Sequence, residues 1–377
     1  MFFMKLNSAV QIFCIAILGV VFAGGSLSLM YYYPMVLAVI FISCIAILHH
    51  KISLKAEHFF IAVLLLIMIF NISTSLDNIS NSKAVVSILL FFIMFFLLTL
   101  HNPTLNDLKA ISQCFIISGF LIALFVLFFK MPTDENPNRY TYLLYGKSLE
   151  PNYLACYLSI TFIITFRKLM FKTTIVKKFF YVIISLSILY AILISGSRGA
   201  FVAILLSALI LFSIDLKTFL MRLSVLTICF VLLFMFLPEN LIERFIAKSY
   251  NDGSNRHRIF LFQTAIAFIL DKPFIGYGIT AGSYITKLGS THNTFLTCGL
   301  NFGLVGLAAF CALIFKILKN ILNKDMRLFL AVFVNLMVTS MIITNLNTIP
   351  LWFTLVFLVY AVNYRIKNPQ VSLWNEL

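Results

Sequence analysis

The feature that most constrains the fold is a series of apolar segments that recurs along the whole chain. Each segment has roughly 17–25 residues, enough for an α-helix to cross a hydrocarbon layer about 30 Å thick. The segments are continuous and rich in Leu, Ile and Phe, which favours helices over a barrel of alternating strands. Of the 377 residues, 62% are hydrophobic and 11% charged, too few charges for the surface of a water-soluble domain. The sequence therefore predicts an all-α polytopic membrane protein.

We predict about twelve transmembrane helices in a single membrane domain over residues 1–377. The first apolar segment lacks a convincing signal-peptide cleavage site, and another span follows at once, so we expect it to be retained. The predicted spans are 8–24, 28–48, 57–74, 84–100, 110–129, 152–167, 176–194, 199–214, 219–237, 294–315, 327–345 and 347–364.

Basic residues are distributed unequally between the two sides of this topology. With the N-terminus inside, the inner loops carry most of the Lys and Arg residues, whereas the short outer loops carry only Lys83 and Arg198. Positive residues favour the cytoplasmic side, so both termini are expected to be cytoplasmic. Much of the net charge of +15 follows from this asymmetry, and nucleic-acid binding is not implied.

Two outer loops, 130–151 and 238–293, are long and contain nine Lys or Arg residues between them. Long loops cross the membrane despite positive charge, so these residues are either tolerated or serve to bind an anionic ligand. Neither loop contains any of the seven cysteines, and the carboxylates of the chain are scattered. We therefore predict no disulfide framework, no metal site and no cofactor.

The first candidate site is the segment Ser195-Gly196-Ser197-Arg198-Gly199-Ala200 at an outer boundary. An arginine at the membrane edge costs free energy unless its side chain reaches water or has a partner. Its small neighbours would let a bulky ligand approach the backbone. The alternative is a tight interhelical turn whose arginine only reaches toward water.

The second candidate lies in the 238–293 loop, where the apolar stretch 259–270 is too short to span a bilayer. We predict a helix that lies in the membrane interface or packs under the loop. Ser254 or Asn255 would cap this helix, and Pro273 and Gly276 would end it.

Arg256, His257 and Arg258 would gather at the N-terminal end of that helix. Free amides and the helix dipole favour an anion there, and arginine binds phosphate in a bidentate, charge-assisted manner. The alternative is a generic amphipathic helix with basic flanks.

Two further motifs lie at outer boundaries. His292, followed by Asn293, precedes the tenth span, and histidine exchanges protons near neutral pH. Glu150, two residues before Asn152, precedes the sixth span. A structural histidine and a helix-capping glutamate are the alternatives.

The order of these motifs resembles that of the bacterial O-antigen ligase and polymerase superfamily. The resemblance rests on Gly-Ser-Arg198-Gly-Ala, on Arg258 fifteen residues before Pro273, on Gly276-x-Gly278, and on His292-Asn293. The twelve-span layout, with its longest outer loop between the ninth and tenth helices, is similar as well.

The resemblance implies a GT-C-type glycosyltransferase of the bacterial inner membrane that acts at its periplasmic face. The donor would be an oligosaccharide linked to undecaprenyl pyrophosphate. By motif, the catalytic residues would be Arg198, Arg258 and His292, in a metal-independent, inverting transfer. Substrate-binding residues would be Arg256, Glu150, Asn152, Asn293, Gly276 and Gly278.

Three functions remain open within this interpretation. The segment Glu150-Pro-Asn-Tyr-Leu-Ala is similar to a motif of polysaccharide polymerases, so we favour an O-antigen polymerase in lipopolysaccharide biosynthesis. An O-antigen ligase, which transfers the lipid-linked glycan to lipid A–core, is the alternative. A flippase for the lipid-linked oligosaccharide is the third, although transporters usually place ionisable residues near the membrane midplane. Membrane lipid, a chain-length regulator and a flippase are the expected partners.

Overall fold

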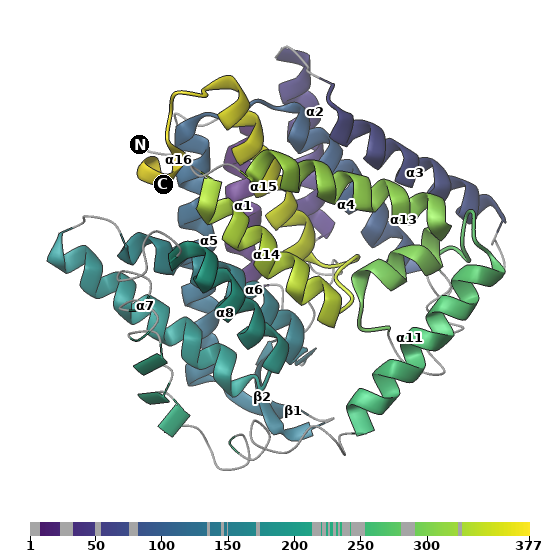
Figure 1. The fold of residues 1–377 in the computed structure, drawn as a ribbon. Coiled ribbons are helices and arrows are strands. Elements are labelled where there is room, and N and C mark those ends of the chain that lie inside the picture. The colour runs from purple at the N-terminus through teal and green to yellow at the C-terminus, as the bar shows by residue number, and fades with distance from the viewer. Residues whose placement is uncertain are drawn as a thin grey trace.

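The described part of the computed structural model is a bundle of helices with a small β-sheet at one edge (Figure 1). It comprises residues 8–22, 33–49, 54–74, 82–133, 136–144, 147–148, 150–170, 174–212, 253–279, 291–322 and 326–377, with a few residues between 220 and 242. The helices are α1 (Ser8–Gly19, followed by a 3-10 turn, Val20–Phe22), α2 (Tyr33–His49), α3 (Ala56–Thr74), α4 (Ser82–Leu100), α5 (Leu105–Phe128), α6 (Pro151–Leu169), α7 (Ile175–Ile194), α8 (Arg198–Phe212), α11 (Gly253–Asp271), α13 (Thr294–Ile321), α14 (Arg327–Ile342), α15 (Ile349–Lys367) and α16 (Leu373–Glu376).

Each predicted span except the ninth coincides with one of these helices. Most of the ninth, 219–237, lies outside the described residues. Within the described residues, four helices (α5, α7, α13 and α15) are long and apolar enough to cross a membrane, and six further apolar helices are shorter. The helices are those of a multi-pass membrane protein; a total of twelve spans stays a prediction.

Helix α15 is the centre of the bundle, because every residue from Ile349 to Tyr364 is buried. Such a helix must be apolar all round. Trp352 packs against Phe91, Phe92 and Phe95 of α4, and its indole nitrogen donates a hydrogen bond to the Leu346 carbonyl (2.7 Å).

Helix α7, by contrast, lies at the edge of the bundle and exposes its N-terminal half (Figure 1). Ile175, Val176, Phe179 and Phe180 are all at least 59% exposed. A protein surface of large apolar side chains is suited to contact with lipid.

The predicted outer loop 130–151 contains a three-stranded antiparallel sheet, which the sequence analysis missed. Its strands are β1 (Lys130–Thr133), β2 (Asn136–Leu144) and β3 (Lys147–Ser148), with Lys130 opposite Tyr142 and Leu143 opposite Ser148. Tyr and Thr in the second strand are typical of β-structure.

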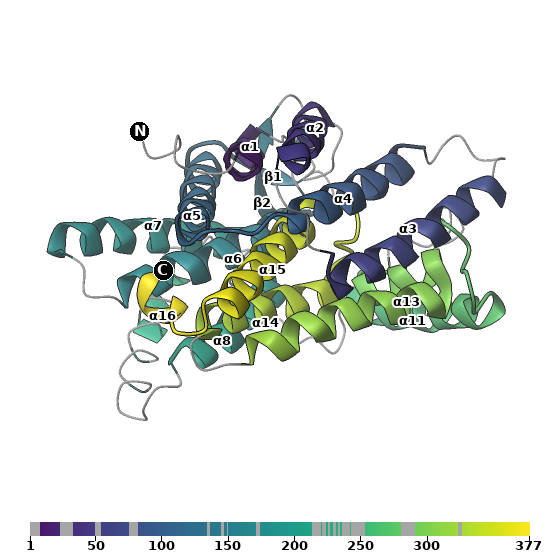
Figure 2. The ribbon, with the colours of Figure 1, turned by 90° about the horizontal axis from the view of Figure 1, so that it is seen from above.

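Helix α13 is broken at Gly303, whose φ of 66° and ψ of −171° are not helical. The break frees backbone groups that residues 273–278 then bind: Tyr277 N–H donates to the Leu300 carbonyl (2.8 Å), and Leu304 N–H donates to the Pro273 carbonyl (2.6 Å). Backbone groups at membrane depth require such internal partners. Helix α3 runs beside α13 (Figure 2), and Asn71 of α3 donates to Asn301 in the broken region (3.1 Å).

Candidate functional site

The candidate site lies where helices α6 and α13 begin and where α14 gives way to α15. Hydroxyl and amide groups from these segments form a network that we call the polar cluster: Tyr153, Thr291, Thr294, Thr297, Thr344 and Asn345. Buried polar groups in an apolar bundle require such partners.

Thr294 is the centre of the polar cluster and is completely buried. Its hydroxyl donates to the Ile343 carbonyl (2.9 Å) and accepts from the Asn345 N–H (2.8 Å). The phenol of Tyr153 on α6 donates to the Thr344 carbonyl (2.9 Å). These bonds hold the start of α6 and the start of α13 against the connection between α14 and α15.

Asn293 is the N-cap of α13. Its side-chain oxygen accepts hydrogen bonds from the N–H groups of Phe295 (2.9 Å) and Leu296 (3.0 Å). The predicted substrate-binding residue therefore has a structural role, because a capping side chain satisfies amides that lack helical partners. Its binding of substrate stays a prediction.

His292 precedes this cap and is the only non-glycine residue with positive φ (50°) among the described residues. Left-handed backbone is uncommon for residues with a side chain, although His, Asn and Asp adopt it more often than most. Such strain gathers at functional sites. The side chain of His292 is half-buried, at the edge of the polar cluster.

Arg198 is the first residue of α8, directly after a turn in which Gly196 has a φ of 65°. Gly199 lets α8 approach α14 closely, since a Cβ there would lie 2.6 Å from the Ile342 side chain. The Arg198 side chain is half-buried. A cation in the first turn of a helix opposes the helix dipole, so this position favours an anionic partner.

Asn152 lies beside this turn, because a small cavity is lined by both Asn152 and Ser197. Glu150 is the N-cap of α6: its carboxylate accepts from the Tyr153 N–H (3.0 Å) and from the Asn152 amide (2.7 Å). The capping alternative considered for Glu150 is thus observed, and a direct contact of Glu150 or Asn152 with substrate stays a prediction.

The N-terminal ends of three helices, α6, α8 and α13, therefore meet around one end of α14. Helix N-termini carry free N–H groups and a partial positive charge. Together with Arg198 they make this end of the bundle suited to a negatively charged group.

Arg256 and Arg258 lie in the first turns of α11, the helix predicted in the long loop. The helix begins at Gly253, one to two residues before the predicted caps Ser254 and Asn255, a difference within the ordinary uncertainty of helix ends. Arg256 is exposed and Arg258 is half-buried.

Helix α11 packs on the first part of α13 through one face. Leu261, Ala265 and Ile269 form a small core with Leu300 and contact Leu296. The opposite face is apolar and open, with Ile259 and Leu270 at least 58% exposed. Arg258 thus lies about one turn before this contact on α11, and His292 lies just before the N-terminus of α13.

Gly276 and Gly278 both have positive φ (71° and 74°) and pack against the break in α13. A Cβ on Gly276 would lie 2.5 Å from the Gly303 nitrogen, and Gly278 N–H donates to the Asn301 carbonyl (3.0 Å). Both glycines have a structural role here; their predicted contact with substrate is not tested by these bonds.

Within the described residues, no group of three or more His, Cys, Asp or Glu side chains is placed to hold a metal ion. Metal independence remains a prediction about the reaction.

The sequence analysis missed the contribution of Thr344 and Asn345. The predicted spans placed both residues at the end of the eleventh helix (327–345), whereas α14 ends at Ile342 and α15 begins at Ile349. The sequence feature that could have indicated this contribution is the polar run Thr344-Asn-Leu-Asn-Thr348 between two apolar segments. Amides and hydroxyls buried between apolar helices cost free energy unless they form hydrogen bonds.

Comparison with known proteins identifies a family for this part of the chain. Residues 180–311 match the O-antigen ligase family. The matched range contains Arg198, Arg256, Arg258, His292 and Asn293.

Curated relatives come from the genus Rickettsia and are provisionally named polysaccharide ligases. The relative from Rickettsia typhi is 29% identical over 191 residues, covering 44% of this chain and 46% of the relative. Those from Rickettsia conorii and Rickettsia prowazekii are each 30% identical over 29% of this chain and 31% of their own length. The aligned regions thus span less than half of these relatives.

These matches do not support the predicted preference for a polymerase and favour the ligase alternative instead. The Glu150-Pro-Asn-Tyr segment, on which that preference rested, lies outside the matched range and caps a helix. The family match and the relatives confirm the predicted resemblance to the O-antigen ligase and polymerase superfamily.

Proposed function

We propose that this protein is an O-antigen ligase, a glycosyltransferase that moves a polysaccharide from a lipid pyrophosphate carrier to lipid A–core. The observation that carries the proposal is the match of residues 180–311 to the O-antigen ligase family, because this range contains all three proposed catalytic residues. The meeting of three helix N-termini beside Arg198 supports it, since the leaving group is an anion.

In the proposed reaction, a hydroxyl oxygen of the acceptor attacks the anomeric carbon of the donor glycan. A new C–O glycosidic bond forms while the bond between the anomeric carbon and the phosphate oxygen breaks. The carrier leaves as a lipid pyrophosphate, and attack from the opposite side inverts the anomeric configuration. His292 takes the proton of the acceptor hydroxyl as a general base.

Arg198 and Arg258 stabilise the negative charge that develops on the departing pyrophosphate. Guanidinium groups bind phosphate oxygens through paired, charge-assisted hydrogen bonds. Their placement at the N-terminal turns of α8 and α11 adds the helix dipoles to the same effect. Arg256, exposed two residues before Arg258, would guide the pyrophosphate toward them.

The donor in this proposal is linked to undecaprenyl pyrophosphate, and transfer takes place at the periplasmic face of the inner membrane. The basic inner loops support this orientation, in which the polar cluster lies at the periplasmic face. The exposed apolar face of α11 is suited to lie against the lipid tail of the carrier.

The test is the lipopolysaccharide banding pattern of a strain that lacks this gene, complemented with the wild-type chain. A ligase predicts bare lipid A–core in the deletion strain and long lipid-linked chains that accumulate. A core with a single repeat unit would show that ligation survives and that the protein is a polymerase. An unchanged ladder would contradict both activities on this polysaccharide.

A further inference from the structure

At the opposite end of the bundle, a cavity of about 250 Å³ opens where α3 begins and where α13 and α15 end. We call it the lysine pocket; its charged and amide residues are Lys55, Glu57, Lys316, Asn320, Asn363 and Lys367. Its volume is several times the ~30 Å³ that one water molecule occupies. The positive-inside rule assigns this end to the cytoplasm.

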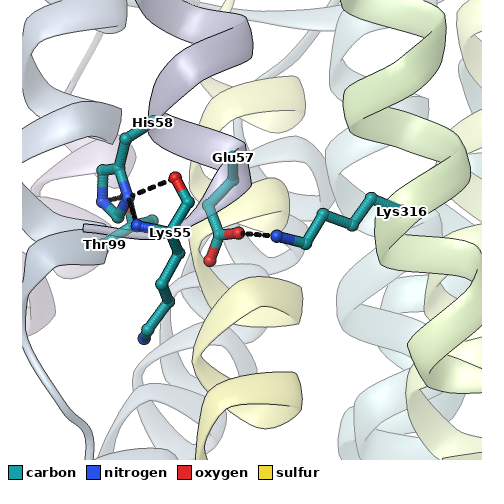
Figure 3. Close-up of polar contacts among 5 residues, drawn as sticks. All are labelled: Lys55, Glu57, His58, Thr99 and Lys316. Atoms are coloured by element: carbon teal, nitrogen blue, oxygen red, sulfur yellow. Dashed lines mark hydrogen bonds and ion pairs between the residues drawn. The ribbon is translucent and has the colours of Figure 1, made fainter. Parts of the chain in front are cut away.

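Only part of the charge in the lysine pocket is paired. Glu57, with a side chain 6% exposed, forms an ion pair with Lys316 at 2.7 Å (Figure 3). The remaining cations, Lys55 and Lys367, leave the pocket with an excess of two positive charges. Glu57 is the only carboxylate that lines the described pocket.

Two buried donors of the lysine pocket have no hydrogen-bond partner among the described residues: Nζ of Lys55 and the amide nitrogen of Asn363. The ring of His58 contacts the backbone of Lys55 (2.9 Å to its nitrogen) and the hydroxyl of Thr99 (3.2 Å), whereas the Lys55 side chain extends away from this ring (Figure 3). Unpartnered buried donors cost free energy, and a bound acceptor would remove this cost.

The electrostatics of Lys55 agree with this geometry. Burial lowers the pKa of its ammonium group from the ordinary value, and the positive charges of Lys367 and Lys316 lower it further, against the opposing effect of Glu57. An anion in the cavity would stabilise the charged form of Lys55.

We propose that the lysine pocket binds a phosphate-type oxyanion through Lys55, Lys367 and Asn363. Lysine provides a compact charge that suits a phosphate, and basic pockets between transmembrane helices on the cytoplasmic side bind anionic headgroups. The phosphate belongs either to the headgroup of an anionic phospholipid or to a soluble phosphate. This proposal is independent of the transferase activity.

The experiment uses the full chain, purified in detergent and stripped of lipid. Native mass spectrometry measures bound phosphatidylglycerol, with phosphatidylcholine of the same acyl chains as the zwitterionic comparison. A second arm measures the unfolding midpoint with inorganic phosphate, against chloride at equal ionic strength. Binding in the first arm identifies a lipid, and binding in the second arm identifies a soluble anion.

We expect Lys55→Gln/Lys367→Gln to weaken binding about 30-fold, since each lysine near a phosphate contributes ~1 kcal/mol and the two together ~2 kcal/mol. Lys319→Gln is the matched control, because Lys319 is exposed on the same helix as Lys316 and does not line the pocket. Lys367→Gln alone, at an exposed position, tests the proposal even where the double variant fails to fold. Equal binding by wild type and Lys367→Gln, or no binding in either arm, would overturn it.

Discussion

The two ends of α15 show opposite solutions for polar groups in an apolar bundle. In the polar cluster, which adjoins its N-terminal end, neutral hydroxyl and amide groups bond to one another, as Thr294 does with Ile343 and Asn345. In the lysine pocket, at its C-terminal end, charged groups predominate, and the Lys55 ammonium has no hydrogen-bond partner in the described part of the chain. A satisfied network fixes the positions of its side chains. Unsatisfied buried donors instead carry a free-energy cost that a bound ligand would remove.

The candidate catalytic side chains are not members of the polar cluster, which serves as their structural support. His292 and Arg198 are half-buried at helix starts next to the cluster, and Arg258 is half-buried on α11, which packs on α13. A rigid support of this kind is what positioned catalytic groups require.

The largest expected effect is that of His292→Gly. Glycine adopts the positive φ of this position freely, so the substitution removes the imidazole without adding backbone strain. We expect transfer to fall by about 10²–10⁴, the usual contribution of a general base. Transfer from a lipid-linked donor is measured with purified protein. Full activity in this variant would show that His292 serves only the backbone turn.

Arg198→Ala and Arg258→Ala are expected to reduce the transfer rate by about 10²–10³ each, the loss typical of one electrostatic donor. Lys178→Ala, an exposed lysine at the start of α7, is the matched control. Protein levels in the membrane are compared by immunoblot. Normal transfer rates in both arginine variants would contradict the proposed role of the two guanidinium groups.

At the lysine pocket, Lys316→Met should destabilise the fold by about 1–3 kcal/mol. The change leaves the buried Glu57 carboxylate without its cation, although Lys316 is itself about one-third exposed, which reduces the effect. Thermal unfolding in detergent measures it. Glu57→Gln/Lys316→Met should recover part of the loss; no recovery would mean that the ion pair contributes little.

At the polar cluster, Thr294→Val should cost about 1–2 kcal/mol, because the Ile343 carbonyl and the Asn345 N–H both lose a buried partner. Thr264→Val on α11 is the control, since its hydroxyl bonds only the local Phe260 carbonyl at an exposed site. Unfolding midpoints again give the comparison. Equal unfolding midpoints for the two variants would show that the Thr294 hydroxyl contributes no more to stability than the exposed Thr264 hydroxyl.

Much of the candidate site could be predicted from the order of motifs along the chain. Arg198 and Arg258 were singled out at the N-terminal turns where the structure places them, and Asn293 at a helix boundary. The role of Gly276 could not be predicted, because its neighbour is the backbone of Gly303 across a tertiary contact. The left-handed backbone of His292 could not be predicted either, because histidine adopts several backbone conformations.

The sequence by itself determined the apolar helices, their order and the chemical character of their boundaries. Hydrophobic length is a local property, and a helix satisfies its own backbone in lipid, so neither depends on distant residues. The tertiary structure decided which boundaries meet. Thr294 bonds Asn345 from 51 residues away, and Glu57 meets Lys316 from 259 residues away. Only the packing of whole helices sets such distances, so composition and periodicity do not contain them.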